Sequence, residues 1–105
     1  MKSVAENEIR QLMDEMMWGT FIATDDGRPY ATKTSFAVEG TFLYTGSKRG
    51  GRINRCIEKN PAVAFKICDS TKDAKLFRAA IVESEAAVLT RRDDTVQCLR
   101  VIYKK

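Results

Sequence analysis

The chain has 105 residues, a net charge of +4 from 18 Lys and Arg against 14 Asp and Glu, and no histidine. This length fits a single domain, residues 1–105, with a small core and little excess stability, so pairing of two copies would help it. The lack of histidine excludes Ser/His/Asp hydrolysis, Cys/His proteolysis and His-ligated metal or haem sites within the chain. We expect no metal site, and demanding chemistry would require a borrowed cofactor.

The predicted location is the cytoplasm. No apolar run is long enough to cross a bilayer, and the first 17 residues carry acidic side chains where a signal peptide would be apolar. Cys56, Cys68 and Cys98 are odd in number, widely spaced and set in segments with apolar periodicity. We therefore expect three buried thiols.

The first predicted element is an amphipathic helix. Ser3 and Glu6 form a capping box at its start. Apolar residues then recur at the spacing of one helical face, namely Ile9, Leu12, Met13, Met16 and Met17. We expect this face, including its methionines, to pack in the core.

A hairpin follows the helix. Residues 18–24 are predicted to form a strand, the Asp-Asp-Gly segment at 25–27 a turn, and residues 29–38 the returning strand. The returning strand is polar in its middle, and its polar residues alternate between two faces, Thr32 and Thr34 on one and Lys33 and Ser35 on the other. Such residues either face solvent or line a polar ligand, and the sequence leaves both open.

A basic, glycine-rich loop follows a predicted third strand at 41–45. It contains Gly46, Ser47, Lys48, Arg49, Gly50, Gly51 and Arg52. Glycine backbone N–H groups, a hydroxyl and guanidinium groups are donors suited to phosphate oxygens, and the N-terminus of the next helix adds positive potential. By spacing alone, a solvated turn explains the loop equally well. The helix has an inward face and a stop signal, made by Ile53, Cys56 and Ile57 and by Asn60 and Pro61.

Two further strands and a helix are predicted after this point. Residues 62–68 and 76–89 have the pattern of strands, and Thr90 with Asp93 is suited to cap a last helix. The apolar side chains of that helix are Val96, Leu99, Ile102 and Tyr103. Tight turns between antiparallel strands predict a mainly β fold, a small β-barrel with flanking helices, because closure removes exposed strand edges.

Several segments resemble the flavin-binding split barrel of the pyridoxamine 5'-phosphate oxidase-like family, including its nitroimidazole-resistance branch. The resemblance rests on DGRPYATKTSF, LYTGSKRGGRI, EKNPAVAFKI and FRAAIVESEA, which occur in the family's order over almost the whole chain. The most specific pieces are the strand end at Tyr44 and Thr45 before the basic loop, and the helix stop at Asn60 and Pro61. The resemblance implies a split β-barrel of the FMN-binding type.

The same resemblance implies a cofactor, a site and a partner. Family members hold FMN between the two subunits of a homodimer, with the phosphate at the loop and helix start and the ring along the second and third strands. The implied phosphate contacts are Ser47, Arg49, Gly51 and Arg52, with Arg52 standing where the family commonly has Lys. The implied ring contacts are Thr32, Lys33, Thr34, Ser35, Tyr44 and Thr45, and a second copy would add Lys75, Phe77 and Arg78.

Three functions remain open from the sequence. The first is an FMN-dependent oxidoreductase that acts on a small-molecule substrate. The second is a flavin carrier or sensor without turnover, because no substrate-specific acid or base is visible, and Lys33 is the one ionisable strand residue that we nominate. The third is a nucleic-acid-binding module built on the basic loop, which is disfavoured because few aromatic residues accompany the basic cluster. We expect no membrane partner.

Overall fold

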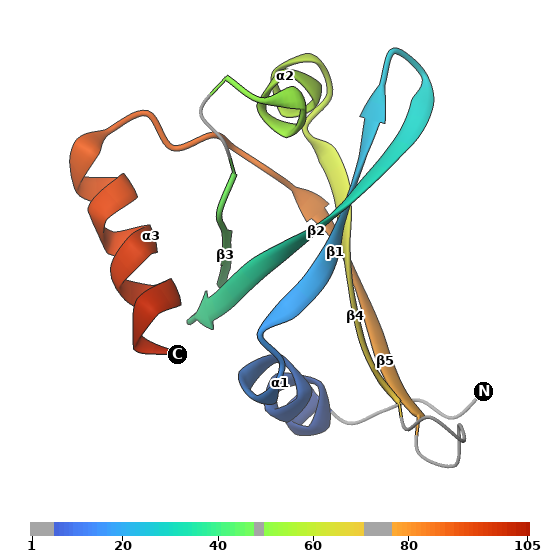
Figure 1. Ribbon diagram of the computed structural model, residues 1–105, viewed down its shortest axis with the longest axis vertical. Helices are drawn as coiled ribbons and strands as arrows, with labels where there is room; N and C mark the ends of the chain where they lie inside the picture. Colours follow the sequence, from blue (N-terminus) through green and yellow to red (C-terminus); the bar gives the residue numbers. More distant parts are fainter. Residues whose placement is uncertain (1–5, 48–49, 71–76) are drawn as a thin grey trace.

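The computed structural model of the protein describes residues 6–47, 50–70 and 77–105 (Figure 1). Within these residues the elements are α1 (Glu6–Glu15), β1 (Trp18–Asp25), β2 (Arg28–Glu39), β3 (Phe42–Thr45), α2 (Arg52–Lys59), β4 (Ala62–Ser70), β5 (Phe77–Glu85) and α3 (Arg92–Lys104). The strands form one antiparallel sheet in the order β3-β2-β1-β4-β5, and it curls into half a barrel. The predicted fold class, a mainly β split barrel with flanking helices, is confirmed.

The β1–β2 hairpin forms where the turn chemistry predicts it. Asp26 and Gly27 both have positive φ, 50° and 82°. This is the conformation that a two-residue hairpin turn requires and that Asp-Gly accepts readily. The turn fixes the register, with Asp25 opposite Arg28 and Phe21 opposite Thr32. The middle of β2 therefore lies beside a buried aromatic residue on one face of the sheet.

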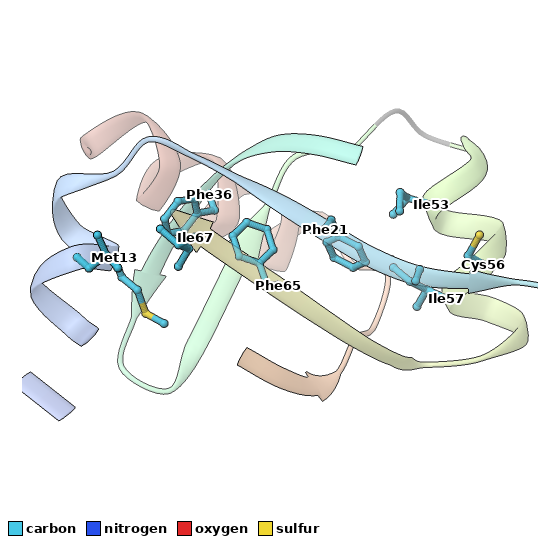
Figure 2. Close-up of a cluster of buried hydrophobic side chains, with 10 residues drawn as sticks. Met13, Phe21, Phe36, Ile53, Cys56, Ile57, Phe65 and Ile67 are labelled. Atoms are coloured by element: carbon cyan, nitrogen blue, oxygen red, sulfur yellow. The ribbon is translucent and has the colours of Figure 1, made fainter. Parts of the chain in front are cut away.

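The core lies along the inner, concave face of the curled sheet, between α1 and α2. Figure 2 shows Met13, Phe36 and Ile67 at one end of it, and Ile53, Cys56 and Ile57 of α2 at the other. Phe21 and Phe65 lie between these groups, with an edge-to-face ring contact at a centroid distance of 6.3 Å. The predicted inward face of the short helix is confirmed, since all three of its residues are buried.

The predicted core face of the first helix is confirmed except at its end. Leu12 and Met13 are buried, and Ile9 and Met16 are partly buried against the core. Met17 is mostly exposed because α1 ends at Glu15, so the chain no longer follows a helical path. The predicted capping residue Ser3 lies outside the described residues.

The last predicted strand is shorter than expected. β5 ends at Glu85 and not at Leu89, because its partner strand β4 begins at Ala62, which pairs with Glu85. The next backbone N–H, that of Ala86, donates to the carbonyl of Pro61 at 2.9 Å. Residue 76, where the predicted strand began, lies outside the described part of the chain.

The last helix differs from its prediction in cap and in buried face. Its N-cap is Arg91, and no side-chain cap hydrogen bond is found in the described structure, so Thr90 lies one residue too early to act as the cap. α3 lies against β2 and β3 (Figure 1) and buries Cys98 and Val101. The predicted apolar residues point elsewhere, since Val96, Leu99 and Tyr103 are exposed and Ile102 is only partly buried.

Two of the three cysteines are buried as predicted. Cys56 and Cys98 are buried, and burial raises the pKa of the Cys98 thiol. Cys68 is exposed, because β4 alternates and Cys68 lies on the face opposite Ile67. No helix among the described residues has the length and apolar character needed to cross a bilayer.

Candidate functional site

A pocket of about 280 Å³ lies between the inner face of the sheet and the start of α2. It is bounded by strand residues, by the loop after β3 and by the first residues of the helix. The lining residues are Phe21, Tyr30, Thr32, Lys33, Thr34, Thr45, Gly46, Ser47, Gly51, Arg52 and Ile53. The pocket thus joins the polar middle of β2 to the glycine-rich loop, two segments that the sequence singled out separately.

The strand wall of the pocket follows from side-chain alternation and register. Phe21 lies opposite Thr32 across the β1–β2 pair, and Thr34 is on the same face two residues later. Thr45 pairs with Phe36, which places it on that face as well. Three threonine hydroxyl groups therefore border the pocket, on the face of β2 that carries Thr32 and Thr34.

Thr34 connects the wall to the loop. Its side chain is buried, and its Oγ1 donates to the carbonyl of Gly46 at 2.8 Å, with the carbonyl of Ser35 at 3.2 Å as a second acceptor. A buried hydroxyl without a partner would be costly, so this bond satisfies the threonine and holds the first glycine of the loop. The loop therefore leaves β3 in a fixed direction.

The start of α2 forms the second wall. Gly51 is the N-cap and provides no side chain over the helix end, and the first turn of α2 contains no acidic residue. The N-terminus of a helix carries positive potential and free backbone donors, so this end favours an anion. The hydroxyl of Ser47 donates to Oδ1 of buried Asn54 at 2.8 Å, which ties the loop to the helix.

Arg52 is held by residues of the hairpin. Its Nε donates to Oδ2 of Asp25 at 2.8 Å, and its guanidinium carbon lies 4.0 Å from the centroid of the Tyr30 ring. Hydrogen bonding to Asp25 raises the pKa of the guanidinium further above its usual range. The arginine is therefore always charged, and it stands at the pocket with one carboxylate partner and one aromatic face.

Lys33 borders the pocket from the other side of β2. The side chain is exposed, and its ammonium nitrogen lies 5.4 Å from the centroid of the Trp18 ring. Together with Arg52 it gives the pocket two cationic residues, and no carboxylate is found among the described lining residues. The pocket is suited to an anionic ligand that also has polar groups for the three threonines.

The structure brings part of the implied site together. Thr32, Lys33, Thr34, Thr45, Ser47, Gly51 and Arg52 all line the pocket. Tyr44 does not, because it pairs with Ala37 and lies on the opposite face of β3 from Thr45, in ring contact with Phe42 at 6.2 Å. Ser35 is also on the opposite face from Thr34, although its Oγ approaches Gly46. Arg49, Lys75 and the side chain of Phe77 lie outside the described residues.

Arg78 is occupied by two carboxylates away from the pocket. Its Nη2 donates to Oε2 of Glu15 at 2.8 Å and to Oδ2 of Asp69 at 2.5 Å, which joins β5 to α1 and β4. The Nε atom is buried and has no hydrogen-bond partner in the described structure. The hydrogen bond from Arg78 lowers the pKa of the Glu15 carboxyl, and both carboxylates raise the pKa of Arg78.

Several pocket residues escaped the sequence analysis. Phe21, Tyr30 and Ile53 were expected only as strand or core residues, and Asp25 only as a turn residue. The alternation of β2 did contain one usable signal, because Tyr30 shares a face with Thr32 and Thr34. The contacts of Asp25 with Arg52 and of Asn54 with Ser47 join separate elements, and no local pattern predicts them.

Comparison with known proteins found no matching family model and no matching curated protein sequence. Solved structures do match. A FAD-binding protein from Mesorhizobium loti superposes with a TM-score of 0.80 and 16% identity, over 98% of this chain and 76% of that one. A protein named for 5-nitroimidazole antibiotic resistance, from Bacteroides thetaiotaomicron, superposes with a TM-score of 0.84 and 15% identity, over 97% of this chain and 66% of that one.

A third similar structure is HutZ, named as the haem storage protein of Vibrio cholerae. It superposes with a TM-score of 0.75 and 20% identity, over 94% of this chain and 71% of that one. The chain therefore spans 66–76% of the length of these proteins. At such low identities the comparison establishes architecture alone, and that architecture is a split barrel.

Proposed function

We propose that the protein binds flavin mononucleotide in this pocket and uses it as an oxidoreductase acting on a small molecule. The observation that carries the proposal is the position of Arg52 and the uncapped start of α2 at one end of a cavity whose other wall is polar. A phosphate needs cationic and backbone donors, and a flavin ring needs hydrogen-bonding groups along its edge. The described residues supply both kinds of group in one place.

The residues divide by role. Arg52 and the backbone at Gly51 would hold the phosphate, and Ser47, whose hydroxyl donates to Asn54, would fix the loop beside it. Thr32, Thr34 and Thr45 would border the ring. Lys33 would keep a positive charge beside the ring edge, where it favours reduced, anionic states. When bound, the flavin would supply hydride and electron transfer.

A homodimer with the flavin at the subunit interface is part of the proposal. A volume of about 280 Å³ is at the lower end of ligand pockets, roughly 300–1,000 Å³, so one chain would enclose only part of a flavin. Trp18 and Ile81 are more than half exposed, and the register places both on the outer face of the sheet. A second copy that covered this face would remove two large apolar side chains from water, and it would reach the pocket at Lys33, which lines the pocket and lies on the same outer face as Trp18.

Arg78 is left out of the proposed site. Its guanidinium already has two carboxylate partners, so an additional phosphate or flavin carbonyl would have to compete with both. Lys75 and Phe77 remain predicted contacts from the second copy.

Equilibrium titration tests the flavin proposal. Purified protein is titrated with FMN and, separately, with riboflavin, which has the same ring without the phosphate, and flavin fluorescence is recorded. We expect FMN to bind at least tenfold more tightly, because Arg52 and the start of α2 act only on the phosphate. Equal affinities would contradict the phosphate assignment, and no binding of either ligand would contradict the flavin site.

Turnover is tested separately from binding. NADH or NADPH oxidation is measured with a quinone or nitroaromatic acceptor, on protein stripped of flavin and on protein reloaded with FMN. We expect activity only in the reloaded sample. The described pocket lining contains no carboxylic acid and the chain has no histidine, an observation that also suits a flavin carrier or sensor. FMN binding without turnover would favour that second function.

Light scattering after size-exclusion chromatography tests the dimer. We expect twice the chain mass at micromolar concentration and tighter association with FMN present, because a ligand shared by two subunits binds only the paired form. A monomer that binds FMN with full affinity would contradict the shared site.

A further inference from the structure

We propose that Asp25 is a positioning residue for Arg52, holding its guanidinium so that the two terminal nitrogens are left for a phosphate. The inference rests on the proposed function, because it concerns the phosphate end of the same pocket. It adds a residue from the hairpin turn, outside the glycine-rich loop and outside the residues that line the cavity.

Three elements meet at Arg52. The residue begins α2, Asp25 ends β1, and Tyr30 belongs to β2. The bond of 2.8 Å from Nε to Oδ2 of Asp25 fixes one edge of the guanidinium, and the Tyr30 ring at 4.0 Å fixes one face. A long arginine side chain otherwise samples many rotamers, and a ligand that binds it must order them. Here Asp25 and Tyr30 already order the Arg52 side chain before a ligand binds.

The donors that remain match an oxyanion. A guanidinium has five N–H donors in a planar fork, and the bond to Asp25 uses the one on Nε. Among the described residues, no hydrogen bond from the terminal nitrogens of Arg52 is found. The Arg52 side chain is 52% exposed, against 29% for Asp25, and Arg52 lines the pocket.

The negative charge of Asp25 is not the useful part of the contact. A carboxylate near a phosphate repels it, so the benefit of Asp25 must come from the hydrogen bond that it accepts. An amide at this position keeps an acceptor oxygen and loses the charge. Asparagine should therefore serve at least as well as aspartate, whereas alanine should not.

The neighbouring residue provides a matched control. Lys59, at the end of α2, contacts Asp26 of the same turn at 3.2 Å, so the helix is tied to the hairpin at both ends. Asp26→Asn removes one charge from this turn, keeps a residue that tolerates its positive φ of 50°, and leaves Arg52 untouched. A general effect of hairpin charge would appear in this variant as well.

The experiment compares Asp25→Ala, Asp25→Asn and Asp26→Asn by fluorescence titration with FMN and with riboflavin. We expect Asp25→Ala to bind FMN about fivefold more weakly than Asp25→Asn, because alanine cannot accept the hydrogen bond that orders Arg52. Asp25→Asn should bind FMN as tightly as the wild type or more tightly, and Asp26→Asn should equal the wild type. All variants should bind riboflavin equally. In an Arg52→Ala background, Asp25→Ala should cause no further loss of FMN affinity.

The outcomes separate this inference from the proposed function. If the wild type binds FMN but Asp25→Ala and Asp25→Asn bind it equally well, the positioning role is overturned and the flavin site stands. Equal losses for FMN and riboflavin would also overturn it, because they indicate general distortion of the pocket. If the wild type binds no flavin, both the positioning role of Asp25 and the proposed flavin site are wrong. Circular dichroism checks folding, and Asp25→Ser replaces Asp25→Ala if the latter does not fold.

Discussion

Two of the three arginines that the resemblance implied as cofactor contacts lie among the described residues, and they stand in opposite situations. Arg52, at the α2 end, has one carboxylate partner and an aromatic face, and it borders a pocket. Arg78, at the α1 end, has two carboxylate partners and joins α1, β4 and β5. One end of the half-barrel thus keeps donors for a ligand, whereas the other uses its donors to hold elements together.

The same contrast extends to the surroundings. At the α1 end, Phe36 and Ile67 are almost fully buried, and Lys105 donates to the carbonyls of Met13 and Phe36 at 2.6 and 3.2 Å. Burial lowers the pKa of this lysine, which has no carboxylate bonded to it in the described structure. At the α2 end, the polar groups border a cavity. Stability and binding should therefore respond to substitutions at different ends.

The largest expected effect on stability is at the α1 end. Phe36→Ala removes a side chain with 1% exposure that contacts the ring of Phe65 at a centroid distance of 5.0 Å. We expect a loss of about 3–5 kcal/mol in the free energy of unfolding. The control is Phe42→Ala, since that ring is 66% exposed. Urea denaturation measures both, and equal losses would contradict the placement of the core.

A smaller effect on stability is expected at Thr34, which links β2 to the loop after β3. Thr34→Val keeps the shape of the side chain but removes the hydroxyl that donates to Gly46. We expect a loss of about 0.5–1.5 kcal/mol in stability, together with weaker FMN binding because the loop loses its anchor to β2. Thr20→Val, on the other face of β1, is the control. A stability loss without any change in FMN affinity would separate the loop from the site.

The smallest effect concerns pH at the Arg78 cluster. The pKa of Glu15 is lowered from its ordinary value of 4.5, chiefly by the hydrogen bond from Arg78. A carboxyl whose folded-state pKa is depressed stabilises the fold above its unfolded pKa, and this contribution disappears as pH falls through the folded value. The melting temperature of the wild type should therefore be slightly above that of Glu15→Gln at pH 7, and the two should converge as pH falls below the lowered pKa of Glu15. A constant difference in melting temperature would contradict the ion pair.

Local chemistry explains why much of the fold could be predicted. The hairpin followed from Asp26 and Gly27, whose positive φ values match their residue types. The short helix followed from the spacing of its buried apolar residues and the stop at Pro61. The end of β5 could not be predicted in this way, because it depends on where β4 begins. The buried face of α3 could not be predicted either, since apolar periodicity does not indicate which element of the fold a helix packs against.

The candidate site divides along the same line. Residues near one another in sequence, such as Thr32 and Thr34 or Ser47 and Gly51, stood out in strand alternation and loop composition, and the family resemblance implied their roles. Tyr44 does not line the pocket, because the β2–β3 register places it on the opposite face of β3 from Thr45. The partners of the two arginines depend on contacts between separate elements. Asp25 is 27 residues from Arg52, and Glu15 is 63 residues from Arg78.

The most direct test of the account compares the two arginines in one binding experiment. Arg52→Ala and Arg78→Ala are titrated with FMN and with riboflavin, after circular dichroism has shown that both are folded. Removing a charge-assisted donor from a phosphate site costs about 1.5–3 kcal/mol, or roughly ten- to a hundredfold in affinity. We expect that loss for FMN in Arg52→Ala alone, with riboflavin unaffected in both variants. Equal FMN affinities in the two variants, or a larger loss in Arg78→Ala, would contradict the account.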